Sequence, residues 1–225
     1  MDMKIDIHGW FVKTIGPKSL ESYSEGHCLS GPRDFYKSIK FPICPACNHM
    51  NSPIMLIDFS DSRLEDLNLW DELLLCIHCH NGCGLKSKYG WPNYWWDYSF
   101  PNEPKILAVE QIVKEEGMPP RDWEFESVEV EIVPRIVKNA YKIETETRIG
   151  GEPAWLQNPL QQERVLLCIG CNKPMQMLFQ WSETNMEYIP KGLGESNGLI
   201  MGNPGMAYWF GCQECKIVGQ IIEYD

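Results

Sequence analysis

Hydrophobic and polar residues alternate with a two-residue period in several segments of the chain. Residues 128–132 alternate valine and isoleucine with glutamate, and residues 142–148 repeat the alternation with isoleucine and threonine as the less polar positions. Such alternation is typical of an antiparallel sheet that buries one face and leaves the other in water. The pattern therefore predicts a mostly β fold of the α+β class, built on antiparallel sheets with few short helices.

Two segments show the spacing of amphipathic helices instead. Leu64, Leu67 and Leu74 fall near helical spacing within residues 61–75. Residues 105–116 carry four apolar positions that would share one helical face, and Gly117 follows as a stop signal. The sequence thus predicts a short helix in each of these two segments.

Two cysteine-containing units resemble each other along the chain. Each reads as a cysteine pair, an apolar strand, a variable loop, a second apolar strand and another cysteine pair. The predicted strands of the first unit lie at 54–59 and 73–75, and those of the second at 175–180 and 208–210. A repeat of this kind predicts two related halves. We expect a division into residues 1–100 and residues 101–225.

Eight of the ten cysteines form four C-x2-C pairs. A tight C-x2-C turn can direct two sulfurs to one point, so two such pairs complete a tetrahedral zinc site. The simplest assignment closes one structural Zn²⁺ within each half, in a zinc-ribbon-like unit, although pairing between the halves stays open. The predicted ligands are Cys44, Cys47, Cys76 and Cys79 in the first half and Cys168, Cys171, Cys212 and Cys215 in the second.

Disulfide bonds and redox pairs are the alternatives to metal binding. The first residues, Met1 to Asp6, lack the apolar run of a signal peptide, so we expect a reducing, cytoplasmic location. In that compartment C-x2-C pairs are more often metal ligands or redox couples than structural disulfides. Four pairs in two similar units favour metal over a redox couple.

The net charge narrows the class of partner. The chain has 225 residues, with 20 Lys and Arg against 31 Asp and Glu, which gives a formal net charge of −11. Two zinc sites with eight thiolates would bring this to roughly −15. Such an acidic protein repels phosphate backbones, so nucleic-acid binding is disfavoured and a basic protein partner is favoured. No apolar stretch has the length of a transmembrane helix.

Large aromatic residues crowd into residues 89–100. They can pack against the first unit and between the two halves, because aromatic side chains bury large areas. They can also anchor a protein interface, where Trp and Tyr are enriched. On the second interpretation, together with an acidic strand face, the predicted partner-binding residues are Trp91, Tyr94, Trp95, Trp96, Glu129 and Glu131.

A phrase before the second unit carries a family resemblance. Residues 148–157 read Arg-Ile-Gly-Gly-Glu-Pro-Ala-Trp-Leu-Gln, followed by Cys168-x2-Cys171 and the return Tyr208-x-Phe210-x-Cys212. In this region the chain resembles the bacterial YwqG-like family of uncharacterised proteins and is more distantly similar to the eukaryotic programmed cell death protein 2 family. The resemblance implies a mostly β fold of two related halves. Eukaryotic relatives act as chaperones of a new ribosomal protein. Gly31-Pro32 is a candidate remnant of the phrase in the first half.

The candidate chemistry favours a non-enzymatic role. Four complete C-x2-C pairs close both metal sites, whereas a catalytic zinc keeps one position open. We expect a module that neutralises a basic protein, either a bacterial toxin domain that it inhibits as an immunity protein or a ribosomal-type client that it chaperones. The alternative is an enzyme that uses Cys28 or Cys83 with a histidine. His78 and His80 are alternative zinc ligands beside Cys79.

Overall fold

The structure is a computed structural model, and the residues it describes are 7–17, 26–67, 70, 73–79, 84–86, 94–107, 111–113, 125, 127–137, 146–155, 166–182 and 205–224. Within them, strands predominate, and the only helices are two short 3-10 turns, η2 (Arg33–Tyr36) and η3 (Glu65–Leu67). The predicted mostly β, antiparallel fold is confirmed.

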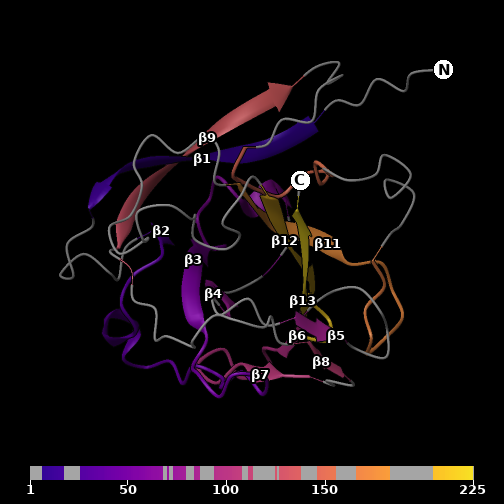
Figure 1. The fold of residues 1–225 in the computed structure, drawn as a ribbon. Coiled ribbons are helices and arrows are strands. Elements are labelled where there is room, and N and C mark those ends of the chain that lie inside the picture. The colour runs from indigo at the N-terminus through magenta and orange to yellow at the C-terminus, as the bar shows by residue number, and fades with distance from the viewer. Residues whose placement is uncertain are drawn as a thin grey trace.

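Eleven strands form one antiparallel sheet in the order β4-β3-β2-β9-β1-β10-β11-β12-β13-β6-β7, and β5 pairs with β8 in a second, small sheet. The long pair of β1 and β9 stands out in Figure 1, and β11, β12 and β13 lie together near the C-terminus. The strands are β1 (Ile7–Pro17), β2 (Cys28–Leu29), β3 (Ser52–Asp58), β4 (Leu73–His78), β5 (Gly84–Lys86), β6 (Tyr94–Asp97), β7 (Lys105–Ile106), β8 (Gln111–Val113), β9 (Val128–Val137), β10 (Arg148–Ile149), β11 (Gln176–Ser182), β12 (Gly205–Cys212) and β13 (Ile217–Tyr224).

The order of the large sheet is symmetric about the boundary between β9 and β1. On one side stand β9, β2 and the β3–β4 hairpin, and on the other stand β1, β10 and the β11–β12 hairpin. The long strands are exchanged: β1 precedes β2 in the sequence but pairs with β10, while β9 precedes β10 but pairs with β2. Each unit therefore contributes one long strand that pairs with a strand of the other unit.

The hairpins repeat in residue detail. The strands β3 and β11 each have seven residues, and both carry a register shift after their second residue, at Pro53/Met55 in β3 and Met177/Phe179 in β11. An identical irregularity at an identical position shows that the two hairpins follow one backbone plan, since bulges are specific features of a strand pair.

The turns after β2 and β10 also correspond. Ser30 and Gly31 have positive φ angles of 55° and 126°, and Gly150 and Gly151 have 70° and 83°. The Ser30 amide donates to the Ile54 carbonyl oxygen at 2.7 Å, and the Gly150 amide donates to Leu178 at 3.0 Å. The structure thus places Ser30-Gly31-Pro32 where the second unit has its Gly-Gly-x-Pro phrase.

Both helix predictions are wrong where the structure describes the residues. Residues 61–67 form turns that end in η3, and Leu73 and Leu74 begin the strand β4. In the second segment, Lys105–Ile106 and Gln111–Val113 are strands. Leucine and valine satisfy helical and strand periodicities alike in short runs, and here the neighbouring strand edges supply the backbone partners.

The predicted domain boundary stays a prediction. The sheet itself joins the two sides of residue 100, because β9 pairs with β2 and β6 pairs with β13. Among the described residues, no helix combines the length and the apolar character that crossing a membrane requires.

The aromatic segment at β6 lies in the core. Tyr94, Trp95 and Trp96 expose 1%, 1% and 0% of their surface. Trp96 stacks on Tyr94 with ring centroids 5.3 Å apart, and the backbone of β6 pairs with that of β13. The prediction that these three side chains form a partner-binding surface is therefore corrected: they are core side chains, Tyr94 and Trp96 in one hydrophobic cluster and Trp95 in another. Trp91 lies outside the described residues.

Candidate metal centres

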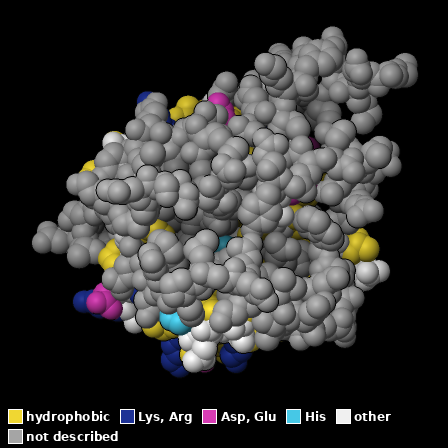
Figure 2. Space-filling view, viewed as in Figure 1, with side chains coloured by type: hydrophobic (Ala, Val, Ile, Leu, Met, Phe, Trp, Pro, Cys, Tyr) yellow, Lys and Arg dark blue, Asp and Glu magenta, His cyan; other side chains and the backbone are white. Residues whose placement is uncertain are grey.

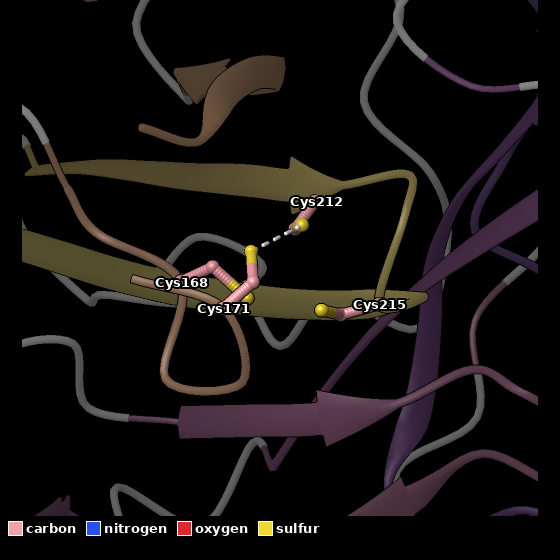
Figure 3. Close-up of side chains that lie close together, drawn as sticks. All are labelled: Cys168, Cys171, Cys212 and Cys215. Atoms are coloured by element: carbon pink, nitrogen blue, oxygen red, sulfur yellow. Dashed lines mark hydrogen bonds between the residues drawn. The ribbon is translucent and has the colours of Figure 1, made fainter. Parts of the chain in front are cut away.

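Four cysteines of the second unit converge on one point (Figure 3). The sulfur atoms of Cys168, Cys171, Cys212 and Cys215 all lie within 4.8 Å of one another. The Cys171 and Cys212 sulfurs are 3.7 Å apart. Thiolates around a tetrahedral zinc, each about 2.3 Å from the metal, stand about 3.8 Å from one another. The donor atoms and their spacing fit one four-coordinate metal ion.

The first cysteine pair of this centre sits in a tight turn. The Cys168 amide donates to the Lys173 carbonyl oxygen, and the Asn172 amide donates back to the Cys168 carbonyl, both at 2.8 Å. Asn172 takes a left-handed φ of 59°, which asparagine tolerates better than most residues. The Gly170 amide points at the Cys168 sulfur at 3.3 Å. This turn directs both sulfurs to the same side.

The second pair comes from the turn between β12 and β13. Cys212 ends β12, and Cys215 follows two residues before β13 begins. The exposed Lys173 and Glu214 form an ion pair that links the two turns. Space is limited here, since a Cβ atom on Gly170 would approach the Cys215 sulfur to 3.1 Å. Gly170 therefore lies directly against the Cys215 side chain.

Three cysteines of the first unit form the corresponding group. The sulfurs of Cys44, Cys47 and Cys79 all lie within 4.8 Å of one another, and those of Cys47 and Cys79 are 3.6 Å apart. All three side chains are buried. The described residues therefore contain two cysteine groups that could hold a metal ion.

The turn that carries Cys44 and Cys47 has the same bonds as its counterpart in the second unit. The Cys44 amide donates to the His49 carbonyl oxygen at 2.8 Å, and the Asn48 amide donates to Cys44 at 2.9 Å. Asn48 has a φ of 60°. The agreement with Asn172 extends the structural repeat from the hairpins to the metal-binding turns.

The prediction that Cys76 is a ligand is wrong. Cys76 lies inside β4 and is fully buried, but it does not belong to the group of Cys44, Cys47 and Cys79. Side chains three residues apart on a strand point to opposite faces, so Cys76 and Cys79 cannot act as a C-x2-C turn when β4 continues through His78. Burial raises the pKa of the Cys76 thiol well above its ordinary value, as expected for a core side chain.

The surroundings of the two cysteine groups lower the pKa of some thiols and raise the pKa of others. A hydrogen bond from Cys79 lowers the pKa of Cys44 from its ordinary 9.0 to about 5. The Lys173 amide lowers the pKa of Cys171, while burial raises the pKa of Cys215 to about 12. One negative sulfur is favoured by its neighbours, and further ones meet burial and like charge. A bound cation offsets this repulsion and holds all the sulfurs deprotonated.

The other site residues predicted from the sequence are two glutamates, two histidines and Cys83. Glu129 and Glu131 are exposed on β9. His78 is buried, with its Nδ1 atom 3.1 Å from the Gln220 side-chain oxygen, and it does not belong to the cysteine group. His80 and Cys83 lie outside the described residues.

The Cys28–His27 pair does not have the geometry of a nucleophile and its base. The Nε2 atom of His27 lies 3.2 Å from Asp61, and its Nδ1 atom accepts from the Asp58 amide at 3.2 Å. The buried Cys28 thiol donates to the carbonyl oxygens of Leu29 and Ser30, each at 3.8 Å. Both ring nitrogens of His27 are thus occupied by other groups.

Comparison of the chain with models of protein families, with curated proteins and with solved structures finds no match.

Proposed function

We propose that each cysteine group holds one Zn²⁺ as a structural ion. The observation that carries the proposal is the convergence of Cys168, Cys171, Cys212 and Cys215 from two turns that are distant in sequence. Soft sulfur donors select zinc or iron, and a four-sulfur tetrahedral set without an open position is typical of structural zinc. The ion then joins the two ends of each unit, because one pair of ligands precedes β3 or β11 and the rest follows the hairpin.

The test is a chelator titration of the full-length protein. We expect a strong zinc chelator to remove zinc and to lower the thermal midpoint by a large amount, since metal binding to such sites contributes on the order of 10 kcal/mol of apparent folding free energy. Added Zn²⁺ should restore the fold, whereas Mg²⁺ should not. A metal-free protein with the same thermal midpoint as the purified protein would contradict the proposal.

We further propose that the chain is a non-enzymatic module that binds a basic protein, either a toxin domain or a ribosomal-type client. The formal net charge of −11 and the exposed Glu129 and Glu131 on β9 support this proposal. Complementary charge speeds the encounter of two proteins and disfavours partners of the same sign. Among the described side chains visible in Figure 2, Lys and Arg occur near the lower edge of that view, in the region of β7 in Figure 1.

Charge reversal on β9 tests the partner proposal. The protein is purified gently from its own cells, and native mass spectrometry identifies any stoichiometric basic polypeptide. The double variant Glu129→Lys/Glu131→Lys should weaken this complex at least tenfold and reduce its salt dependence. Asp34→Lys/Glu65→Lys is the matched control, since both residues are also exposed but lie in η2 and η3. Equal effects of the two variants, or a bound acidic partner, would contradict a specific role of β9.

The enzymatic alternative rests on Cys28 or Cys83 with a histidine. The contacts of His27 and Cys28 disfavour the first of these pairs. A thiol-reactive probe distinguishes a cysteine enzyme from a non-enzymatic zinc protein. An activated thiolate reacts rapidly near neutral pH, whereas a buried or metal-bound sulfur does not.

A further inference from the structure

The three-cysteine group of the first unit is one sulfur short of its counterpart. Cys44, Cys47 and Cys79 are buried and converge within 4.8 Å. A structural zinc is almost always four-coordinate, so three thiolates leave one position to be filled. Cys76 cannot fill it, because the described strand β4 carries this side chain into the core and away from the group.

The hairpin register gives the position from which the fourth ligand should come. Met55, the fourth residue of β3, pairs with Cys76, and Phe179, the fourth residue of β11, pairs with Trp209. Cys76 therefore occupies the position of Trp209, a core residue that exposes 0% of its surface.

Three residues further along the sequence, the two units reach corresponding ligands. The step from Trp209 leads to Cys212, and the same step from Cys76 leads to Cys79. Both Cys79 and Cys212 belong to their cysteine groups. The step from Cys212 to Cys215 would lead from Cys79 to Gly82, and the residue after Gly82 is Cys83.

We propose that Cys83 is the fourth ligand of the first centre, so that this zinc is held by a C-x2-C pair, Cys44 and Cys47, and a C-x3-C pair, Cys79 and Cys83. The proposal rests on the proposed function, since it completes a zinc site. Cys83 lies outside the described residues, and its position in the sequence supports the assignment. Four residues span at most about 14 Å, so the short segment after Cys79 keeps Cys83 within chain reach of the group.

The following strands support the same assignment. In the second unit, β13 begins at Ile217, shortly after Cys215. In the first unit, β5 begins at Gly84, directly after Cys83. In both units the last cysteine therefore stands between the end of a hairpin strand and the start of the next strand. When Zn²⁺ binds, the Cys83 thiol loses its proton to solvent and the sulfur forms the fourth metal bond.

Cobalt substitution of the full-length protein tests this assignment. Co²⁺ in place of Zn²⁺ reports the number of bound thiolates through sulfur-to-cobalt charge-transfer bands. In the wild type we expect two metal ions per chain, both with four-thiolate spectra. Cys83→Ser should lose one thiolate from the spectrum or one metal from the count. Cys76→Ser should keep both metals and the wild-type spectrum, even if it lowers the thermal midpoint. His80→Gln should also keep the wild-type spectrum.

Thiol labelling of the wild type keeps the test independent of the folding of any variant. With metal bound, Cys83 should resist alkylation, and chelator should expose Cys83 together with Cys44. Rapid labelling of Cys83 in the two-metal protein, or loss of a thiolate in Cys76→Ser or of a nitrogen ligand in His80→Gln, would overturn the assignment while leaving the zinc proposal intact. Absence of metal from the wild-type protein would overturn the proposed function itself.

Discussion

The two units follow one backbone plan but bury different side chains at corresponding positions. Across neighbouring strands, the first unit places Cys28, Leu56 and Leu75 side by side, and the second places Arg148, Gln180 and Tyr208. All six side chains are buried. The comparison shows that the turns, the bulges and the cysteines define the repeated backbone, whereas the same sheet positions accept an apolar row or a polar one.

The polar row, which consists of Arg148, Gln180 and Tyr208, holds the segment after β10 in place in the second unit. The Ala154 amide donates to the Gln180 side-chain oxygen at 2.8 Å, and the Tyr208 hydroxyl donates to the Ala154 carbonyl at 2.6 Å. Arg148 also donates to Gln180, at 3.2 Å. These bonds fix the segment after β10 on the sheet, and Trp155 then packs against Tyr208 with ring centroids 4.7 Å apart.

Removal of one ligand from the second centre should have the largest effect. Cys212→Ser should release the metal of that unit and unfold the β11–β12 region, because each site is worth on the order of 10 kcal/mol. Metal content and the thermal midpoint are the measurements. Cys28→Ser is the matched control, since Cys28 is buried but belongs to neither group, and it should keep both metals. A stably folded Cys212→Ser protein with one metal fewer would contradict a structural role.

Conversion of the polar row toward the apolar one should have the next largest effect. Gln180→Leu introduces the residue type of Leu56 but leaves the Ala154 amide and Arg148 without this acceptor. A buried polar group that loses its partner costs about 1–3 kcal/mol, and more when it is charged. We expect a loss of about 2–4 kcal/mol in the free energy of unfolding by urea titration. Leu56→Met, which conserves volume, should cost less than about 1.5 kcal/mol. Equal losses would show that the polar row contributes nothing specific.

The two left-handed asparagines allow a sharper comparison of the metal-binding turns. Asn48→Ala and Asn172→Ala should each cost about 1 kcal/mol, because an alanine Cβ is disfavoured at a φ near 60°. Asn48→Gly and Asn172→Gly should restore most of this loss, since glycine adopts positive φ freely. If the turns are equivalent, the two alanine variants lower the stability alike. A loss confined to one turn would show that the repeat stops at the hairpins.

The smallest expected effect is a pH dependence of stability that comes from His27. The second unit has no histidine at the corresponding position. Burial lowers the pKa of His27 below its ordinary 6.5, against the opposing influence of Asp61. The unfolded chain therefore takes up a proton near pH 6.5 that the folded protein binds only at lower pH. The free energy of unfolding should fall as the pH drops through this region, by at most about 1.4 kcal/mol per pH unit.

The variant His27→Gln isolates this contribution. It should reduce the slope of stability against pH below about pH 6.5, relative to the wild type. Arg63 and Asp61 stay charged just below pH 6.5, because their ion pair lowers the pKa of the Asp61 carboxyl and raises the pKa of the Arg63 guanidinium, and the variant leaves both residues in place. An unchanged slope would assign the pH dependence to other groups, such as the metal-binding thiols.

The sequence predicts the strands and the cysteine repeat because both depend on local pattern. The alternation at residues 128–132 and the apolar runs beside the cysteines became β9 and the two hairpins. The strand order could not be predicted, because β1 pairs with β9 and β10 through contacts between distant segments. The same limit applies to Tyr94, Trp95 and Trp96, whose burial depends on the pairing of β6 with β13.

The candidate site shows where local spacing misleads. The spacing of Cys76 and Cys79 matches that of Cys212 and Cys215, but the first pair begins inside a strand and the second begins at the end of one. A signal was present in the sequence: the apolar run from Leu73 continues through Ile77, past Cys76, whereas Phe210 is followed by glycine before Cys212. The position at which the apolar run ends identifies the turn better than the cysteine spacing does.

The central claim is that two equivalent centres, one in each unit, each hold a structural zinc. Native mass spectrometry of the gently purified full-length protein, before and after chelation, tests it most directly. We expect two Zn²⁺ per chain in the folded protein and a shift to the highly charged ions of an unfolded chain once both are removed. A folded protein that carries one zinc, or none, would contradict the claim.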